Sequence, residues 1–252
     1  MILICELNLL SPDNILMTGK LTGVSKKLFF RFSLIITACF LSSVNNMYSQ
    51  SVGDYRSVTN GVWTDRSIWE RFDGSVWDQP TPGEGYPAQY TSPSRIDIDT
   101  DVTLNTNFTN TGDPRINDLY INSPGSLESG NRNFTVNGQT YIDGTLNDNS
   151  TENTVIFYGN INISDIGIWN AAANVSDEIR LYADIINNSN NVSLQRIRIY
   201  SDVVLSGTGS IDVTEYFEFN NTYTLTNRLQ ISVGVGINAN NKYATWINEG
   251  TL

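Results

Sequence analysis

A short turn sequence that recurs at a regular interval constrains the fold of this chain more than any other feature. Glycine followed by serine or threonine and then by leucine or isoleucine occurs four times, and Gly167-Ile-Trp169 is a looser copy. The four copies are Gly125-Ser-Leu127, Gly144-Thr-Leu146, Gly209-Ser-Ile211 and Gly250-Thr-Leu252. The intervals between the five glycines are 19, 23, 42 and 41. A period of about 21 residues that is skipped twice fits all of them.

The two skipped positions carry asparagine in place of glycine. They fall near residues 188 and 229, where the chain has Asn188-Ser189 and Asn227-Arg-Leu229. Asparagine tolerates the left-handed backbone region better than most residues that carry a side chain. We therefore expect these asparagines to adopt the left-handed conformation that glycine would supply.

Short segments with alternating apolar and polar residues lie between the turns, as in strands with one buried face. Examples are Phe134–Val136, Val155–Tyr158, Ile197–Tyr200 and Tyr216–Phe219. One turn in about 21 residues matches one coil of a stack, in which each coil buries its apolar row against its neighbours. We predict an all-β fold, a parallel β-helix or β-solenoid. An antiparallel β-sandwich, in which a strand recurs about every 8 to about 12 residues, is the alternative.

The chain divides into three parts. We assign 1–49 to an N-terminal extension with a signal peptide, 50–93 to a Trp/Pro-rich cap, and 94–252 to the β-solenoid repeats. A stack of coils has two ends that expose apolar core and unpaired strand edges. The cap can cover the first end, but the sequence stops at Leu252 directly after a turn. We therefore expect a fragment, truncated at its C-terminus.

The N-terminal part has the features of an export signal. Lys26 and Lys27 precede an apolar core of ten residues, 32–41, which is shorter than the roughly 20 apolar residues of a membrane-spanning helix. Ser49 offers a small residue for cleavage before Gln50. We predict a secreted or outer cell-surface protein that is not an integral membrane protein after cleavage. An uncleaved anchor is the alternative.

The composition excludes several kinds of chemistry. The chain has no histidine, and its two cysteines, Cys5 and Cys39, both precede Gln50. Zinc sites of cysteine and histidine, Ser–His–Asp triads and disulfides are therefore excluded after cleavage. Four of the 15 basic and two of the 26 acidic residues precede Gln50, so the net charge of −11 becomes −13 from Gln50 onward. No nucleic acid is expected as a partner, because phosphate binding needs a basic face.

Three of the five tryptophans stand close together, at Trp63, Trp69 and Trp77. Their even spacing places the side chains on one face of an extended chain, although Thr64 or Asp65 also suits the cap of a single helical turn. Clustered tryptophans form either a hydrophobic plug or a stacking platform for sugar rings. We favour a plug that caps the stack.

The order of residues in this segment forms a further pattern. Gly61-Val-Trp63-Thr-Asp65 is followed by two more tryptophans, a proline-rich loop and the strand-like run Ser94–Leu104. The pattern resembles the opening of large secreted surface proteins of Bacteroidota-type bacteria. The resemblance implies a right-handed parallel β-helix, often followed by adhesion modules and a type IX secretion sorting domain. Arg66 stands where those proteins usually have proline, and no sorting domain lies within these 252 residues.

Asp97, Asp99 and Asp101 alternate along one predicted strand and are a weak candidate for calcium binding. An EF-hand loop needs glycine at its sixth position and glutamate at its twelfth, where this chain has Val102 and Phe108. We therefore interpret the three aspartates as residues of a solvent-facing strand and expect no cofactor.

A second weak candidate consists of basic and acidic residues near the end of the repeats. They are Arg196, Arg198, Asp212, Glu215 and Glu218. Polysaccharide lyases and hydrolases use such groups in a groove, but any alternating strand gives the same spacing. We predict a structural and adhesive module without enzymatic activity, whose partners are extracellular glycans or cell-surface components. A carbohydrate-active β-helix, or its glycan-binding part, is the alternative.

Overall fold

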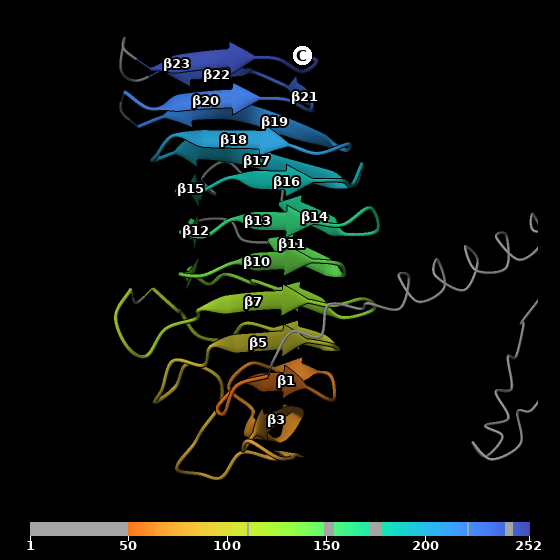
Figure 1. The fold of residues 1–252 in the computed structure, drawn as a ribbon, viewed down its shortest axis with the longest axis vertical. Helices are drawn as coiled ribbons and strands as arrows, with labels where there is room; N and C mark the ends of the chain where they lie inside the picture. Colours follow the sequence, from red (N-terminus) through yellow and green to blue (C-terminus); the bar gives the residue numbers. More distant parts are fainter. Residues whose placement is uncertain (1–49, 110, 149–153, 172–177, 221, 240–243) are drawn as a thin grey trace, which may run out of the picture. The chain divides into compact units, whose positions relative to one another are not determined.

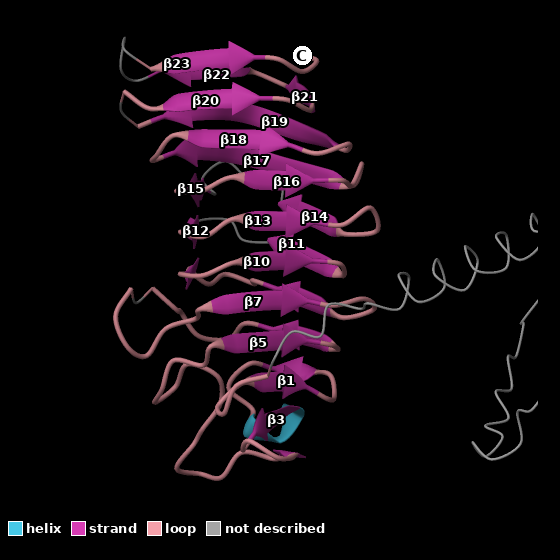
Figure 2. Ribbon diagram, in the orientation of Figure 1, coloured by secondary structure: helices cyan, strands magenta, loops and turns pink. Residues whose placement is uncertain are grey.

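A computed structural model describes residues 50–252, except 110, 149–153, 172–177, 221 and 240–243. The predicted signal peptide lies outside the described residues. Strand accounts for 50% of the structure and helix for 2%, which confirms the all-β prediction. Figure 2 shows the strands and the single short helical turn of the described part. None of the described residues forms a helix that is long and apolar enough to cross a membrane.

The strands stack into a parallel β-solenoid of about six turns (Figure 1). Each full coil passes through three faces, here called faces A, B and C. Face A is an 11-stranded sheet, and faces B and C are the two arms of a second sheet, which share β17 and β19.

Each face consists of the following strands. Face A contains β1 (Tyr55–Ser57), β3 (Trp69–Phe72), β4 (Trp77–Asp78), β5 (Arg95–Ile98), β7 (Asp118–Ile121), β10 (Thr140–Ile142), β13 (Ile161–Ile163), β16 (Ile185–Asn187), β18 (Val203–Ser206), β20 (Thr224–Asn227) and β23 (Thr245–Asn248). Face B contains β2 (Gly61–Val62), β6 (Asp101–Thr103), β8 (Ser126–Glu128), β11 (Thr145–Asp148), β14 (Ile168–Ala171) and β21 (Gln230–Val233). Face C contains β9 (Phe134–Val136), β12 (Thr154–Phe157), β15 (Glu178–Leu181) and β22 (Gly236–Ala239). The shared strands are β17 (Val192–Ile199) and β19 (Ser210–Phe219), and a 3₁₀ turn, η1 (Arg66–Ile68), precedes β3.

The register of face A confirms the predicted coil length of about 21 residues. From β5 to β23, the sequence numbers of partners on adjacent strands differ by 20 to 24: Leu205 follows Ile185 by 20, and Ile185 follows Ile161 by 24. All of these pairs are parallel. In the described part of the chain, antiparallel pairing joins only β1 to β3 and β3 to β4. The antiparallel sandwich is therefore wrong.

Apolar rows that run along the stack fill its interior. On face B the row is Leu127, Leu146, Trp169, Val192, Ile211 and Ile231. On face C the row is Phe134, Val155, Ile179, Ile197 and Phe217. All are buried, while their neighbours along each strand point outward, because side chains alternate between the two sides of a strand.

The turn glycines mark the points where one coil rests on the next. An ideal Cβ at Gly144 would lie 2.2 Å from the carbonyl oxygen of Gly125, and one at Gly209 would lie 2.1 Å from that of Ser189. None of the five turn glycines has a positive φ. Close backbone approach, and not left-handed geometry, is therefore the reason for glycine at these turns.

The expectation of left-handed asparagines at the skipped positions is wrong, because no asparagine in the described part of the chain has a positive φ. Asn187 and Asn227 are fully buried and act through their side chains. Asn187 accepts from the backbone N–H of Ser189 at 2.9 Å and donates to its carbonyl oxygen at 3.0 Å. Asn227 makes the same two bonds with Leu229, at 3.2 and 3.0 Å. The amide thus replaces a glycine turn with a side-chain-braced turn.

Candidate functional site

Two of the three clustered tryptophans lie in the core at the N-terminal end of the stack, where β2, η1 and β3 meet. Trp63 and Trp69 have no exposed surface, and their rings contact edge to face at 5.1 Å. The indole N–H of Trp63 donates to the carbonyl oxygen of Pro87 at 3.0 Å, and that of Trp69 donates to the carbonyl oxygen of Trp63 at 2.8 Å. Their burial leaves neither ring accessible to a sugar.

The local sequence explains how these rings are held. Asp65 accepts from the backbone N–H of Ser67 at 2.9 Å and caps η1, so the helical turn allowed by the sequence is present. Trp77 lies apart on β4, half-buried, with Phe72 at 5.3 Å and the Arg56 guanidinium 4.7 Å from its ring centre. Its ring is therefore already engaged in a cation–π contact.

The three aspartates of the calcium candidate do not converge. Arg95 binds Asp97 through two nitrogens, at 2.5 and 2.8 Å. Asn122 donates to both Asp97, at 3.1 Å, and Asp99, at 2.7 Å, so these two carboxylates meet at one amide and Asp101 does not join them. Burial raises the pKa of Asp99. Asp101 begins β6 on face B, around the corner from β5. No cluster of three acidic, histidine or cysteine residues suited to a metal occurs among the residues that the structure describes.

The structure brings together four of the five residues in the second candidate. On the outer side of face C, Arg196 pairs with Glu215 at 3.1 Å, and Arg198 pairs with Glu218 at 2.5 Å. Asp212 is separated from them, because it faces outward on face B, where Ser232 donates to its carboxylate.

One arginine of face C links three successive coils. Arg198 also pairs with Glu178 on β15, at 2.9 Å, so it contacts carboxylates on both neighbouring coils. Burial disfavours its charged form, but the hydrogen bonds with Glu218 and Tyr200 and the charges of Glu178 and Glu218 outweigh burial and raise the pKa of Arg198. Arg180 pairs with Glu178 as well, at 3.0 Å.

A ladder of tyrosines borders these ion pairs, and sequence reasoning missed it. Tyr158, Tyr182 and Tyr200 each follow a strand segment of face C, and their ring centres are 4.5 and 5.1 Å apart. The signal was present, since the tyrosines recur at intervals of 24 and 18, close to the coil length. Tyr182 has a neighbouring tyrosine on each side, so it presents its ring edge and hydroxyl rather than a flat platform.

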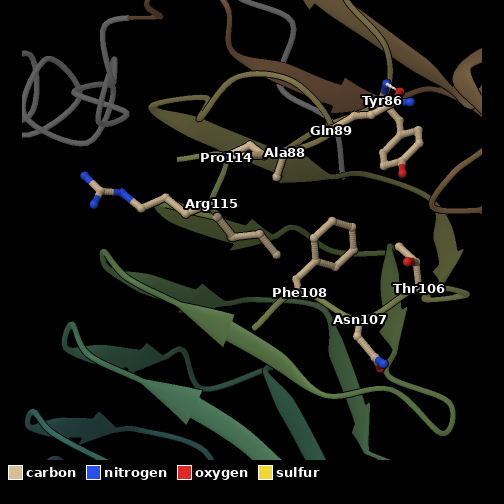
Figure 3. Close-up of a pocket in the computed structure, with 9 residues that line it drawn as sticks. Tyr86, Ala88, Gln89, Thr106, Asn107, Phe108, Pro114 and Arg115 are labelled. Atoms are coloured by element: carbon tan, nitrogen blue, oxygen red, sulfur yellow. Dashed lines mark hydrogen bonds between the residues drawn. The ribbon is translucent and has the colours of Figure 1, made fainter. Parts of the chain in front are cut away.

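A hollow of about 180 Å³ lies near the cap, between the proline-rich loop and the connection from β6 to β7. Figure 3 shows the rings of Tyr86 and Phe108 directed into this space, with the methyl group of Ala88 above it. The remaining lining residues are Gln89, Thr106, Asn107, Pro114, Arg115 and Ile116. Sequence patterns do not indicate this hollow, because it forms where two irregular loops, at 86–89 and 106–116, pack together.

Comparison with known proteins adds no relative: no protein family, no curated protein and no solved structure matches the chain. The resemblance to secreted surface proteins therefore remains an interpretation of the sequence pattern.

Proposed function

We propose that this protein is a secreted or cell-surface structural module, in which the β-solenoid is a rigid scaffold with an adhesive outer surface. The observation that carries the proposal is that the charged side chains on face C form ion pairs between neighbouring coils. Arg198 joins Glu178 and Glu218 across three coils, and Arg196 holds Glu215. The carboxylates that the sequence offered for acid–base chemistry are thus engaged in contacts between coils.

The surface chemistry supports an adhesive role with neutral or basic partners. From Gln50 onward the net charge is −13, and the outward rows carry amide and hydroxyl groups that can bind polar partners. The predicted export signal supports a position outside the cell for such a surface. Extracellular glycans and cell-surface components are the partners that fit these properties.

One observation favours a second candidate, a carbohydrate-active β-helix. Glu215 lies at the bend of β19 between faces B and C, where it accepts from Gln195 at 3.0 Å and pairs with Arg196 at 3.1 Å. A partly exposed carboxylate beside an arginine is the kind of group that glycosidases and lyases use. Both of its oxygens are already engaged, one by Gln195 and the other by Arg196.

Beads coated with the full chain test the two functions side by side. The beads are offered to surfaces of extracellular polysaccharides, and new reducing or unsaturated sugar ends are measured in the same wells. The proposal predicts adhesion to at least one polysaccharide without new ends. Turnover that Glu215→Gln abolishes, and that the matched exposed variant Glu249→Gln retains, would instead establish the enzyme.

A further inference from the structure

The hollow beside the cap arises where the regular coil opens. In later coils the chain crosses face C as a strand, but here it leaves the ladder after Phe108 and rejoins it at Ile116. Phe108 forms a bridge with Phe134, and Ile116 forms one with Val136, at the two ends of β9. The segment between Phe108 and Ile116 is therefore an irregular loop where later coils have a strand. Loops of this kind on a rigid scaffold often carry binding residues.

Hydrogen bonds between the two loops hold the walls of the hollow in place without a ligand. Ser92, from the proline-rich loop, donates to Asp113 at 2.6 Å and accepts from the backbone N–H of Arg115 at 2.9 Å. Asn117 donates to the carbonyl oxygen of Pro93 at 2.8 Å. These bonds clamp the β6–β7 connection onto the proline-rich loop.

Two further contacts shape the interior. The ring of Phe108 packs on the buried Trp63 at 5.2 Å between centres, so Trp63 positions the aromatic floor without itself reaching the hollow. Ala88 has a φ of 60°, the one positive value among non-glycine residues in the described part, and this strained backbone lies in the wall.

The lining groups define the chemistry of a ligand. Phe108, Ile116, Ala88 and Pro114 supply apolar surface. The hydroxyls of Tyr86 and Thr106 stand beside them. The amides of Gln89 and Asn107 also border the hollow, but their oxygens already accept from the backbone N–H groups of Tyr86, at 3.2 Å, and Asn133, at 3.0 Å. Among the described residues, no carboxylate lines the hollow.

The charged group among these described lining residues is turned away from the hollow. The guanidinium of Arg115 donates to Asn117 at 2.9 Å and to the carbonyl oxygen of Thr111 at 2.9 Å, and Figure 3 shows it directed outward. The hollow is also far smaller than the roughly 300 Å³ at which pockets for drug-sized molecules begin. It therefore suits one small, uncharged ring with an apolar face and several hydroxyls.

We propose that this hollow binds a neutral pyranose, the terminal sugar of a glycan, with the apolar face of the ring against Phe108. The inference rests on the proposed function and names the ligand class of its adhesive surface. Aromatic rings accept the C–H face of a sugar, while amides and hydroxyls pair with its hydroxyl groups.

Saturation-transfer NMR of the full chain with methyl glycosides of neutral hexoses tests the inference, with a uronic acid as the charged comparison. We expect binding of at least one neutral glycoside and none of the uronic acid. Tyr86→Phe and Thr106→Val each remove a hydroxyl with little change of shape, and each should weaken binding by about fivefold. The exposed Tyr90, on the same loop but outside the lining, provides the control Tyr90→Phe, which should bind as the parent does.

Three outcomes would overturn the inference: no neutral glycoside binds, binding is unchanged in both variants, or an aromatic peptide binds in place of the sugars. Bead adhesion separates this inference from the proposed function. Beads that still adhere when coated with the Tyr86→Phe, Thr106→Val double variant contradict the sugar site and leave the adhesive module standing. Glycoside binding by a protein whose beads adhere to nothing supports the sugar site and contradicts the adhesive function.

Discussion

A single methyl group at Gly144 should weaken the whole stack. The Cβ of Gly144→Ala would lie 2.2 Å from the carbonyl oxygen of Gly125 and 2.8 Å from that of Asn122. An ordinary carbon–oxygen contact is about 3.3 Å, so the coils must separate locally by roughly 1 Å, about a fifth of the spacing between strands.

The separation strains two backbone hydrogen bonds at the same turn. Gly144 donates to the carbonyl oxygen of Ile121 at 2.7 Å, and Thr145 donates to that of Gly125 at 3.1 Å. Each such bond contributes about 0.5–1.5 kcal/mol net. Overpacking of this kind costs about 1–3 kcal/mol in general, and we expect Gly144→Ala to fall in that range.

Urea denaturation followed by circular dichroism measures the effect. Gly83→Ala is the matched control, because a Cβ at Gly83 meets nothing within 4 Å, and its unfolding midpoint should stay at the parent value. An unchanged midpoint in Gly144→Ala, or an equal loss in Gly83→Ala, would refute the idea that close contact between coils requires glycine.

Three further predictions use the same denaturation assay. Trp63→Ala should lower the free energy of unfolding by about 3–5 kcal/mol, because the ring is fully buried, whereas Trp77→Ala should cost about 1 kcal/mol; equal losses would contradict the cap packing. Arg198→Met removes the ion pair of the little-exposed Glu218 and leaves Glu178 with Arg180 alone, so it should cost about 2–4 kcal/mol. Arg228→Met, whose ion pair is exposed, should cost less than about 1 kcal/mol, and similar losses in the two variants would contradict the bracing of coils by Arg198. Asp99→Asn should stabilise the protein at pH 7, because burial raises the pKa of Asp99 and makes its charged form unfavourable in the folded state. The gain in stability should vanish below pH 3.8, the ordinary pKa of the group, where Asp99 is protonated in both the folded and the unfolded state. A gain that persists below this pH would contradict burial as the cause.

Much of the fold could be predicted because a solenoid repeats its local signals. The glycine turns revealed the coil length, and the alternating strands revealed which side faces inward. The sequence suggested that glycine is needed for a left-handed backbone, and this reason was wrong. A positive φ and a close carbonyl oxygen both require glycine, so the sequence alone cannot tell the two reasons apart. Asn187 and Asn227 show why, because their buried amides brace these turns, and the left-handed backbone that was expected of Asn188 and Asn227 is absent.

The candidate site was less predictable, because its residues meet only through the stacking of coils. Clustered tryptophans suggested a plug or a platform, and the structure places Trp63 behind Phe108, whose ring faces the hollow. Sequence spacing could not distinguish Asp212 from Glu215, since the bend of β19 between them turns their side chains onto different faces.

Every ladder and ion pair between coils follows from parallel stacking at the observed register. Asn147 and Asn170 are outward partners on adjacent strands of face B, at a spacing that suits a disulfide. Both are changed to cysteine in a chain that also carries Cys5→Ser and Cys39→Ser, and intact mass is measured after mild oxidation. The stacked solenoid predicts an intramolecular disulfide in this pair and none in the control pair of Asn147 with Ser232, which lies several coils away. A failure of the first pair to close, or closure of the control, would contradict the stacked solenoid.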